Sequence, residues 1–119
     1  MILRQLSEAD VEFTIRCDPE DLPYVGFCSR VNAVIDKQTE LWIHQQLERG
    51  NEWAWCFVTV MATWQSIVGH SCLGGCSYRS EEEFCRPGGY YQELQTDAIT
   101  DLNREIERLK LLLTQLEAK

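Results

Sequence analysis

The chain has 119 residues, a mass of 13.8 kDa and a sequence pI of about 4.7. Hydrophobic residues make up 45% of it and charged residues 25%, which is typical of one small globular domain. The length excludes a fold as large as an eight-stranded α/β barrel. The formal net charge of −8 disfavours binding to a phosphate backbone, so we expect no direct nucleic-acid ligand.

The first half of the chain predicts a strand, a loop and a helix. Apolar and polar residues alternate over 10–16, as they do in a half-buried strand. Two prolines in 17–23 then predict a loop. Apolar residues recur at helical spacing over 29–49, with charged residues between them and Gly50 behind them. This segment therefore predicts an amphipathic helix.

The middle of the chain predicts a pair of strands. Residues 53–64 carry no charge and are rich in aromatic and β-branched side chains at both parities, which predicts a central strand covered on both faces. Residues 67–72 are expected to pair back with it as a short antiparallel strand, through a tight connection at Gln65 and Ser66. The glycines of 73–78 then predict a bend in the chain.

The last third predicts two helical segments. Ser80 followed by Glu83 matches a capping box, which starts a helical turn. No glycine or proline occurs from Tyr90 to the C-terminus, which predicts a helix of about 28 residues. We therefore expect the α+β class: a body of residues 1–89, with a small antiparallel sheet packed by an amphipathic helix, and a long helix of residues 90–119 in the same domain.

The C-terminal helix carries a heptad seam typical of a two-stranded coiled coil. The seam residues are spaced 3, 4, 3, 4 and 3 apart, and they are Ile99, Leu102, Ile106, Leu109, Leu113 and Leu116. In a parallel pair, Glu105 of one copy would meet Lys110 of the other. A helix of roughly 42 Å is longer than a compact domain of this size, about 35 Å across. Three readings stay open: the helix packs on its own sheet, it forms a homodimer, or it docks on a foreign protein.

Acidic residues are dense near the N-terminus. Between residues 8 and 21, Arg16 is the only basic side chain, and the acidic ones are Glu8, Asp10, Glu12, Asp18, Glu20 and Asp21. The simpler reading is a solvated surface that keeps the protein soluble. The second reading is a binding site for a protein partner with a basic surface.

The cysteine content and the N-terminus together predict a reducing environment. The chain has six cysteines, but residues 1–8 lack the basic start and the apolar core of a secretion signal. There is also no uncharged run of 18 apolar residues that would predict a membrane span. We expect a cytoplasmic protein with free thiols.

One group of side chains has the composition of a zinc site. His70, Cys72, Cys76 and Cys85 lie within sixteen residues and could supply four tetrahedral ligands. Their spacing differs from the common zinc motifs, and free cysteines are often buried in cores. We therefore expect no metal and no catalytic residue, and keep a zinc- or thiol-dependent factor as an alternative.

Several short motifs carry a resemblance. The sequences GNEWAWC at 50–56, LGGCSY at 73–78 and GGYY at 88–91 resemble those of small uncharacterised proteins encoded by bacteriophages and mobile elements. The resemblance covers roughly residues 50–103. In that pattern an aromatic residue often stands at the position of Cys72 and no cysteine at that of Cys85, which weakens the zinc hypothesis. The resemblance implies an accessory protein that acts inside a bacterial host cell, with no activity attached to it.

These observations lead to one functional expectation with two alternatives. We expect a non-enzymatic, acidic, phage-type protein that binds a protein partner, such as a nucleic-acid-handling or CRISPR-type defence complex of the host. The first alternative is the zinc- or thiol-dependent factor, and the second is a minor structural component of a virion.

Overall fold

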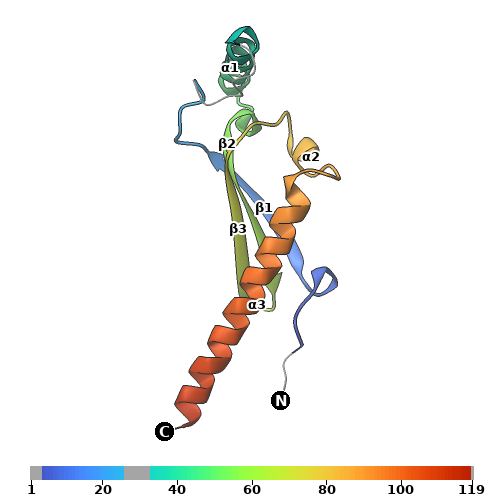
Figure 1. Cartoon of the computed structure of the whole chain (residues 1–119), viewed down its shortest axis with the longest axis vertical. Helices are drawn as coiled ribbons and strands as arrows, with labels where there is room; N and C mark the ends of the chain where they lie inside the picture. The colour runs from blue at the N-terminus through green and yellow to red at the C-terminus, as the bar shows by residue number, and fades with distance from the viewer. Residues whose placement is uncertain (1–3, 26–32, 119) are drawn as a thin grey trace.

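The computed structural model describes residues 4–25 and 33–118. Its elements in chain order are η1 (Glu8–Asp10), β1 (Glu12–Pro19), α1 (Ala33–Glu48), η2 (Glu52–Ala54), β2 (Cys56–Trp64), β3 (Ile67–Cys76), α2 (Glu81–Phe84) and α3 (Tyr90–Glu117). The strands form one antiparallel sheet in the order β1-β2-β3, and α3 runs along one face of it (Figure 1). The predicted α+β class, the antiparallel sheet and the long C-terminal helix are confirmed.

The core lies between α3 and the facing side of the sheet. Alternate side chains of the central strand β2 are fully buried there: Cys56, Val58, Val60 and Ala62. They pack with the buried face of α3, which consists of Leu94, Ala98 and Leu102. The alternation arises because successive strand residues point to opposite faces of a sheet.

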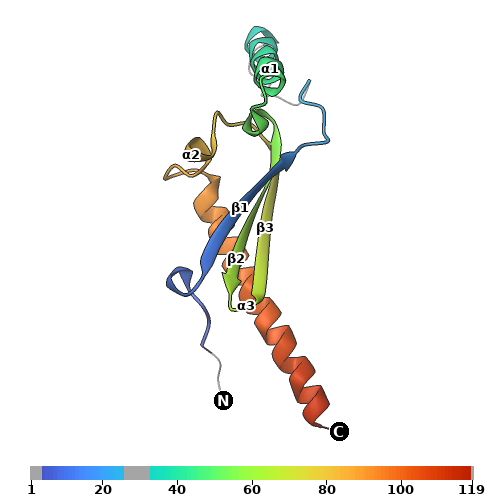
Figure 2. The ribbon, with the colours of Figure 1, turned by 180° about the vertical axis from the view of Figure 1, so that it is seen from behind.

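The helix that covers the sheet is α3, and its approach depends on Gly69 in β3. A Cβ atom at this position would lie 2.3 Å from the carbonyl oxygen of Ala98 and 2.4 Å from the amide nitrogen of Leu102. The backbone of α3 therefore rests directly on the backbone of β3. The amphipathic helix α1, in contrast, lies at one end of the sheet beside η2 (Figures 1 and 2).

The prediction that β2 is covered on both faces was wrong. β2 is the central strand, but in the described part of the chain no helix lies on the face opposite α3 (Figure 2). On that face Phe57 is 37% exposed, and Met61 and Thr63 are partly exposed. Thr59, on the same face, is only 3% exposed although no helix of the described residues lies over it. Apolar residues at both parities of a strand therefore do not require a second layer.

Both outer strands are longer than predicted. β1 continues through Cys17 and Asp18, which pair with Val58 and Phe57, so the expected loop begins only after Pro19. A proline is tolerated here because β1 is an edge strand and Pro19 is its last residue. β3 likewise continues to Cys76, and the predicted bend is a bulge within the strand.

The starts of the helices follow the predicted signals. The Ser80 hydroxyl accepts a hydrogen bond from the Glu83 N–H and caps α2, and α3 begins at Tyr90 as expected. The predicted helix over 29–49 is observed as α1, and residues 29–32 lie outside the described residues. Trp53 and Ala54, expected as the start of the strand, instead lie in the 3₁₀ turn η2, where the Asn51 side chain accepts a hydrogen bond from the Trp53 N–H.

The molecule is elongated, with extents of 64 × 28 × 27 Å. α3 continues beyond the turn between β2 and β3, so the end of the helix stands free of the sheet (Figures 1 and 2). Among the described residues, no helix is both long enough and apolar enough to cross a bilayer.

Candidate interaction surfaces

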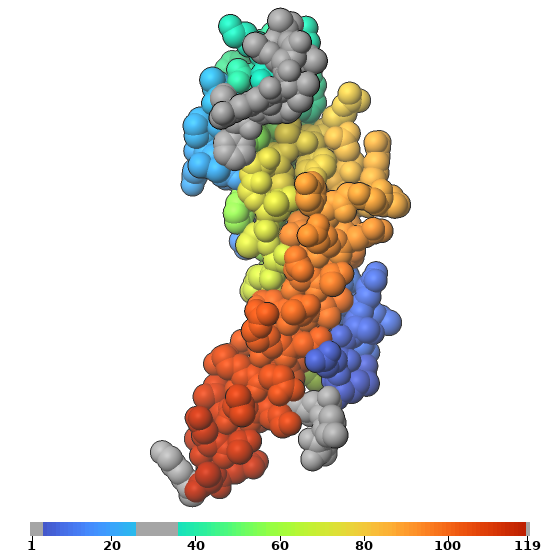
Figure 3. All heavy atoms as spheres, in the orientation of Figure 1, coloured from blue at the N-terminus to red at the C-terminus, as the bar shows by residue number. Residues whose placement is uncertain are grey.

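The six acidic residues predicted as a partner site are spread along the sheet. Glu8 and Asp10 precede β1, and Glu20 and Asp21 follow it. The strand has eight residues, so roughly 26 Å separates its ends. The segments around residues 8 and 20 accordingly lie at different heights and on opposite sides of the molecule (Figure 3). The six residues do not form one contiguous patch.

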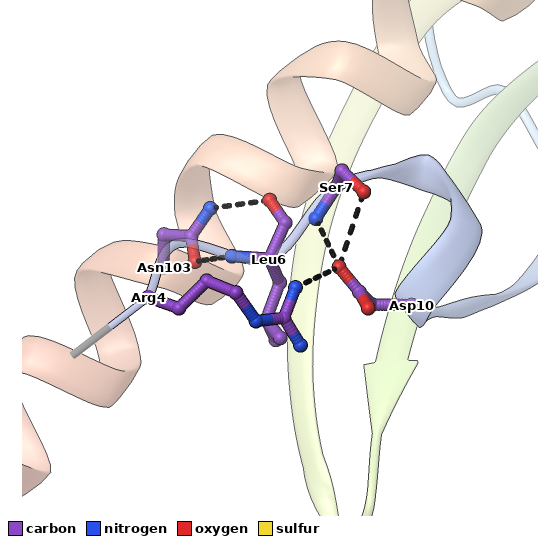
Figure 4. Close-up of polar contacts among 5 residues, drawn as sticks. All are labelled: Arg4, Leu6, Ser7, Asp10 and Asn103. Carbon is purple, nitrogen blue, oxygen red and sulfur yellow. Dashed lines mark hydrogen bonds and ion pairs between the residues drawn. The ribbon is translucent and has the colours of Figure 1, made fainter.

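Asp10 holds the N-terminal segment in place. Its Oδ2 accepts hydrogen bonds from Arg4 Nη1 at 2.8 Å and from the Ser7 N–H at 2.7 Å (Figure 4). The hydrogen bond from Arg4 contributes most, and with that from Ser7 it lowers the pKa of Asp10 to about 2. The same segment is tied to α3 by a reciprocal pair, in which the Leu6 N–H donates to Asn103 Oδ1 and Asn103 Nδ2 donates to the Leu6 carbonyl (Figure 4). Asp10 therefore has a structural role.

Glu20 supports the bulge in β3. Its Oε2 accepts a hydrogen bond from the Gly75 N–H at 2.7 Å, and its Oε1 accepts one from the Leu22 N–H at 3.2 Å. The hydrogen bond from the Gly75 N–H lowers the pKa of Glu20 most, and that from the Leu22 N–H lowers it further. Gly75 adopts a φ of +64°, which favours glycine, so the bulge combines a local glycine with a distant carboxylate.

The other predicted acidic residues are more available to a partner. Asp18 forms an ion pair with Arg16 at 2.8 Å on the surface. Glu8, Glu12 and Asp21 are exposed. A partner would therefore meet these three carboxylates before it met those of Asp10 or Glu20.

Three exposed carboxylates that are distant in sequence lie near the partly buried side chains of Cys17 and Tyr91. Burial raises the pKa of the Cys17 thiol, and the nearby negative charges of Glu52 and Glu81 raise it further. Burial likewise raises the pKa of Tyr91, to which the charges of Glu81 and Glu8 add. Glu52 and Glu81 therefore both lie within electrostatic reach of Cys17, and Glu81 and Glu8 lie within reach of Tyr91. All three carboxylates are exposed, and η1 and α2, which carry Glu8 and Glu81, lie on the same side of the molecule (Figures 1 and 2). We call Glu8, Glu52 and Glu81 the acidic flank.

The sequence shows Glu81–Glu83 as a second acidic cluster, but it does not relate this cluster or Glu52 to Glu8. The search for acidic density along the chain found Glu8 but could not bring in residues from η2 and α2. The pairing of β1 with β2 and the position of α2 at the start of α3 place them together. The Glu81–Glu83 cluster is visible in the sequence, whereas its relation to Glu8 and Glu52 depends on this topology.

The four residues considered for zinc do not converge. His70 and Cys72 pair with Met61 and Thr59 on the open face of the sheet, whereas Cys76 pairs with Cys56 in the core. Across residues 4–25 and 33–118, no group of three His, Cys, Asp or Glu side chains could hold a metal ion.

The thiols of the core cysteines Cys56 and Cys76 are expected to have low reactivity. Burial, followed by the nearby Glu20 carboxylate, raises the pKa of Cys76 to about 11, and burial also raises the pKa of Cys56. Both side chains are therefore protonated near neutral pH, and the thiol is a much weaker nucleophile than the thiolate.

The heptad seam is divided between two environments. Leu102 is fully buried, and Ile99 and Ile106 pack against the core. Leu109 is half-buried, whereas Leu113 and Leu116 are 61% and 72% exposed. The first half of the seam therefore packs on the chain's own sheet, and the second half lies beyond the sheet. We call residues 109–118 the tip.

A groove runs along the tip on the side that continues the seam. Its volume is about 410 Å³, and its lining consists of Ile67, Ile106, Leu109, Lys110, Leu113, Thr114 and Glu117. Glu105, expected to meet Lys110 of a parallel partner, forms an ion pair with Arg108 of its own helix.

A second, polar groove lies between α1 and the segment that joins β3 to α2. It has a volume of about 360 Å³ and is lined by Gln38, Thr39, Trp42, Ser77, Arg79 and Glu83. No sequence motif pointed to it, because its two walls are almost forty residues apart.

Comparison with models of protein families, with characterised proteins and with solved structures gives no match to this chain.

Proposed function

We propose that this chain is a non-enzymatic binding protein whose acidic flank docks on a basic surface of a protein partner. The observation that carries the proposal is the set of exposed carboxylates that η1, η2 and α2 contribute near Cys17 and Tyr91. Residues 1–103 contain 16 acidic and 7 basic side chains, whereas residues 104–119 contain 3 and 4. The negative charge therefore belongs to residues 1–103, which are the body together with the part of α3 that packs on the sheet, and there it would steer a basic partner.

The chemistry of the thiols supports binding over catalysis. The Cys56 and Cys76 thiols are buried and have raised pKa values, which disfavours a thiolate nucleophile. His70 and Cys72 lie on the opposite face of the sheet from Cys76, so they cannot act with it as a base or as a shared ligand set.

The partner we propose is a nucleic-acid-handling complex in the cytoplasm of a bacterial host, including a CRISPR-type defence complex. Such machines bind phosphate backbones through basic surfaces. The acidic flank competes for the same surface by presenting carboxylates in place of phosphates. The resemblance of the central motifs to those of phage and mobile-element proteins supports this setting.

Affinity capture tests the proposal. The wild-type chain and a Glu8→Lys, Glu52→Lys, Glu81→Lys variant are immobilised and exposed to bacterial lysate, with and without phage infection. We expect the wild-type chain to retain one stoichiometric partner and the variant to lose it, because three attractive contacts become repulsive.

The matched control reverses three other exposed carboxylates. Glu93→Lys, Asp97→Lys and Glu107→Lys together change the net charge by the same amount, but these residues lie on the outer face of α3, away from the core. The control is expected to capture the partner as the wild-type chain does. Equal capture by the flank variant would contradict the proposal.

A further inference from the structure

We propose that two copies of this chain associate through their tips, with the two α3 helices antiparallel and the two acidic bodies at opposite ends. This inference goes beyond the proposed function and does not depend on it. The occupant of the tip groove is the tip of the second copy, in which Leu113 and Leu116 are the central contacts.

The sheet decides the orientation of the pair. The seam residues Leu102 and Ile106 face the chain's own sheet, and Leu113 and Leu116 continue the same face of the helix beyond it. Paired helices pack about 8–10 Å apart. In a parallel pair, each helix would carry its own sheet on the face that is turned toward the partner. Both sheets would then have to fit between the two helices within two turns of the contact. In an antiparallel pair each sheet lies beyond the end of the other helix, and the space is free.

The distribution of charge favours the same arrangement. The body carries a strong excess of acidic side chains, whereas residues 104–119 carry a net charge of +1. A parallel pair would hold two acidic bodies side by side, where like charges repel. The antiparallel pair joins the two nearly neutral segments and separates the acidic ones by the length of the molecule.

The flanks of the tip groove are complementary to themselves. Lys110 and Glu117 both line the groove and lie seven residues apart on one side of the helix. When a twofold axis passes between Leu113 and Leu116, each Leu113 meets the partner's Leu116, and each Lys110 meets the partner's Glu117. The pair therefore gains two symmetric ion pairs around a leucine centre.

The size of the tip sets the expected strength. The overlap covers about three turns of each helix, which is less than the roughly 800 Å² per partner of a standard interface. We therefore expect reversible dimers with a dissociation constant in the micromolar range or weaker, visible by sedimentation equilibrium over a wide range of protein concentration.

Leucine substitutions test the interface. We expect Leu113→Gln with Leu116→Gln to weaken dimerisation at least about a hundredfold, because both apolar contacts are lost in each copy. Both side chains are largely exposed, so the fold is retained. Leu111 is equally exposed, at 63%, but points to the opposite side of the helix. Leu111→Gln is the control and is expected to dimerise as the wild-type chain does.

Charge reversal tests the orientation. Lys110→Glu alone and Glu117→Lys alone are each expected to weaken the dimer about tenfold, and the double variant is expected to restore it, because the antiparallel pairs are rebuilt with opposite signs. In a parallel dimer the partner of Lys110 is Glu105, so the double variant would stay weak.

The maximum dimension of the dimer is an independent test of the antiparallel arrangement. One chain is 64 Å long, and an overlap of about three turns predicts a maximum dimension of roughly 110 Å in small-angle X-ray scattering. A monomer at every concentration, a dimer little longer than 64 Å, or a dimer that survives the two leucine substitutions would each overturn the proposal.

Discussion

Asp10 illustrates how a surface charge can serve the fold. Its carboxylate accepts hydrogen bonds from Arg4 and Ser7, and its pKa is about 2 instead of the ordinary 3.8. Because the folded pKa lies below the unfolded one, the contact contributes stability that is fully present above about pH 4 and is lost as the pH falls toward 2.

The Asp10→Asn variant tests this linkage. We expect its loss of unfolding free energy relative to the wild-type chain to be larger at about pH 5 than at about pH 2.5, measured by urea denaturation. Asp97→Asn, on the outer face of α3, serves as the control and should lose little stability because its side chain is exposed. A loss for Asp10→Asn that is equal at both pH values would refute the assignment.

The cysteines give a second prediction at this scale. Cys72 is exposed, whereas Cys56 and Cys76 are buried with raised pKa values. We expect an alkylating reagent to label Cys72 rapidly and the two core thiols slowly, with each site followed by peptide mass spectrometry. Rapid labelling of Cys76 in the folded protein, with loss of partner capture, would instead favour a thiol-dependent factor.

The roles of individual carboxylates could not be predicted from the sequence. The density of acidic residues identified Glu8 and Glu20 as equivalent candidates. The structure separates them, because Glu20 binds the Gly75 N–H across 55 residues, whereas Glu8 stays exposed. Such a contact depends on the bulge in β3, and local composition carries no information about it.

At the scale of elements, sequence signals predicted correctly those features whose physical cause lies within a few residues. The Ser80 cap and the start of α3 after a pair of glycines were predicted because capping and chain-breaking act within a few residues. The end of β1 and the open second face of β2 were not, because they depend on which strand is at the edge and where α3 lies. The heptad seam was found correctly as a pattern, but its division between core and tip depends on the length of the sheet.

The contact between α3 and β3 can be tested at Gly69. A Cβ atom there would collide with the backbone of Ala98 and Leu102, which cannot move without displacing the helix. We expect Gly69→Ala to reduce the free energy of unfolding by about 1–3 kcal/mol or more, measured by urea denaturation. Cys72→Ala, in the same strand but exposed on the other face, should change it by less than about 0.5 kcal/mol. An equal effect of the two substitutions would show that α3 does not rest on β3.

For the whole molecule, the notable feature is the separation of charge and apolar surface. The acidic residues lie on the body, and the exposed leucines lie at the far end of α3. An antiparallel dimer would present two acidic flanks at opposite ends, which raises the avidity for a partner that offers two basic surfaces. The length of the chain and the heptad pattern predicted a protruding helix, and the extents of 64 × 28 × 27 Å show that the molecule is elongated.

The most direct test of the proposed function is the affinity of the captured partner, once purified, as a function of salt concentration. Docking by the acidic flank predicts that the dissociation constant of the wild-type chain rises steeply with salt. The variant with Glu8, Glu52 and Glu81 reversed is then expected to bind more weakly, with little dependence on salt. The same affinity and the same salt dependence for both proteins would contradict the account.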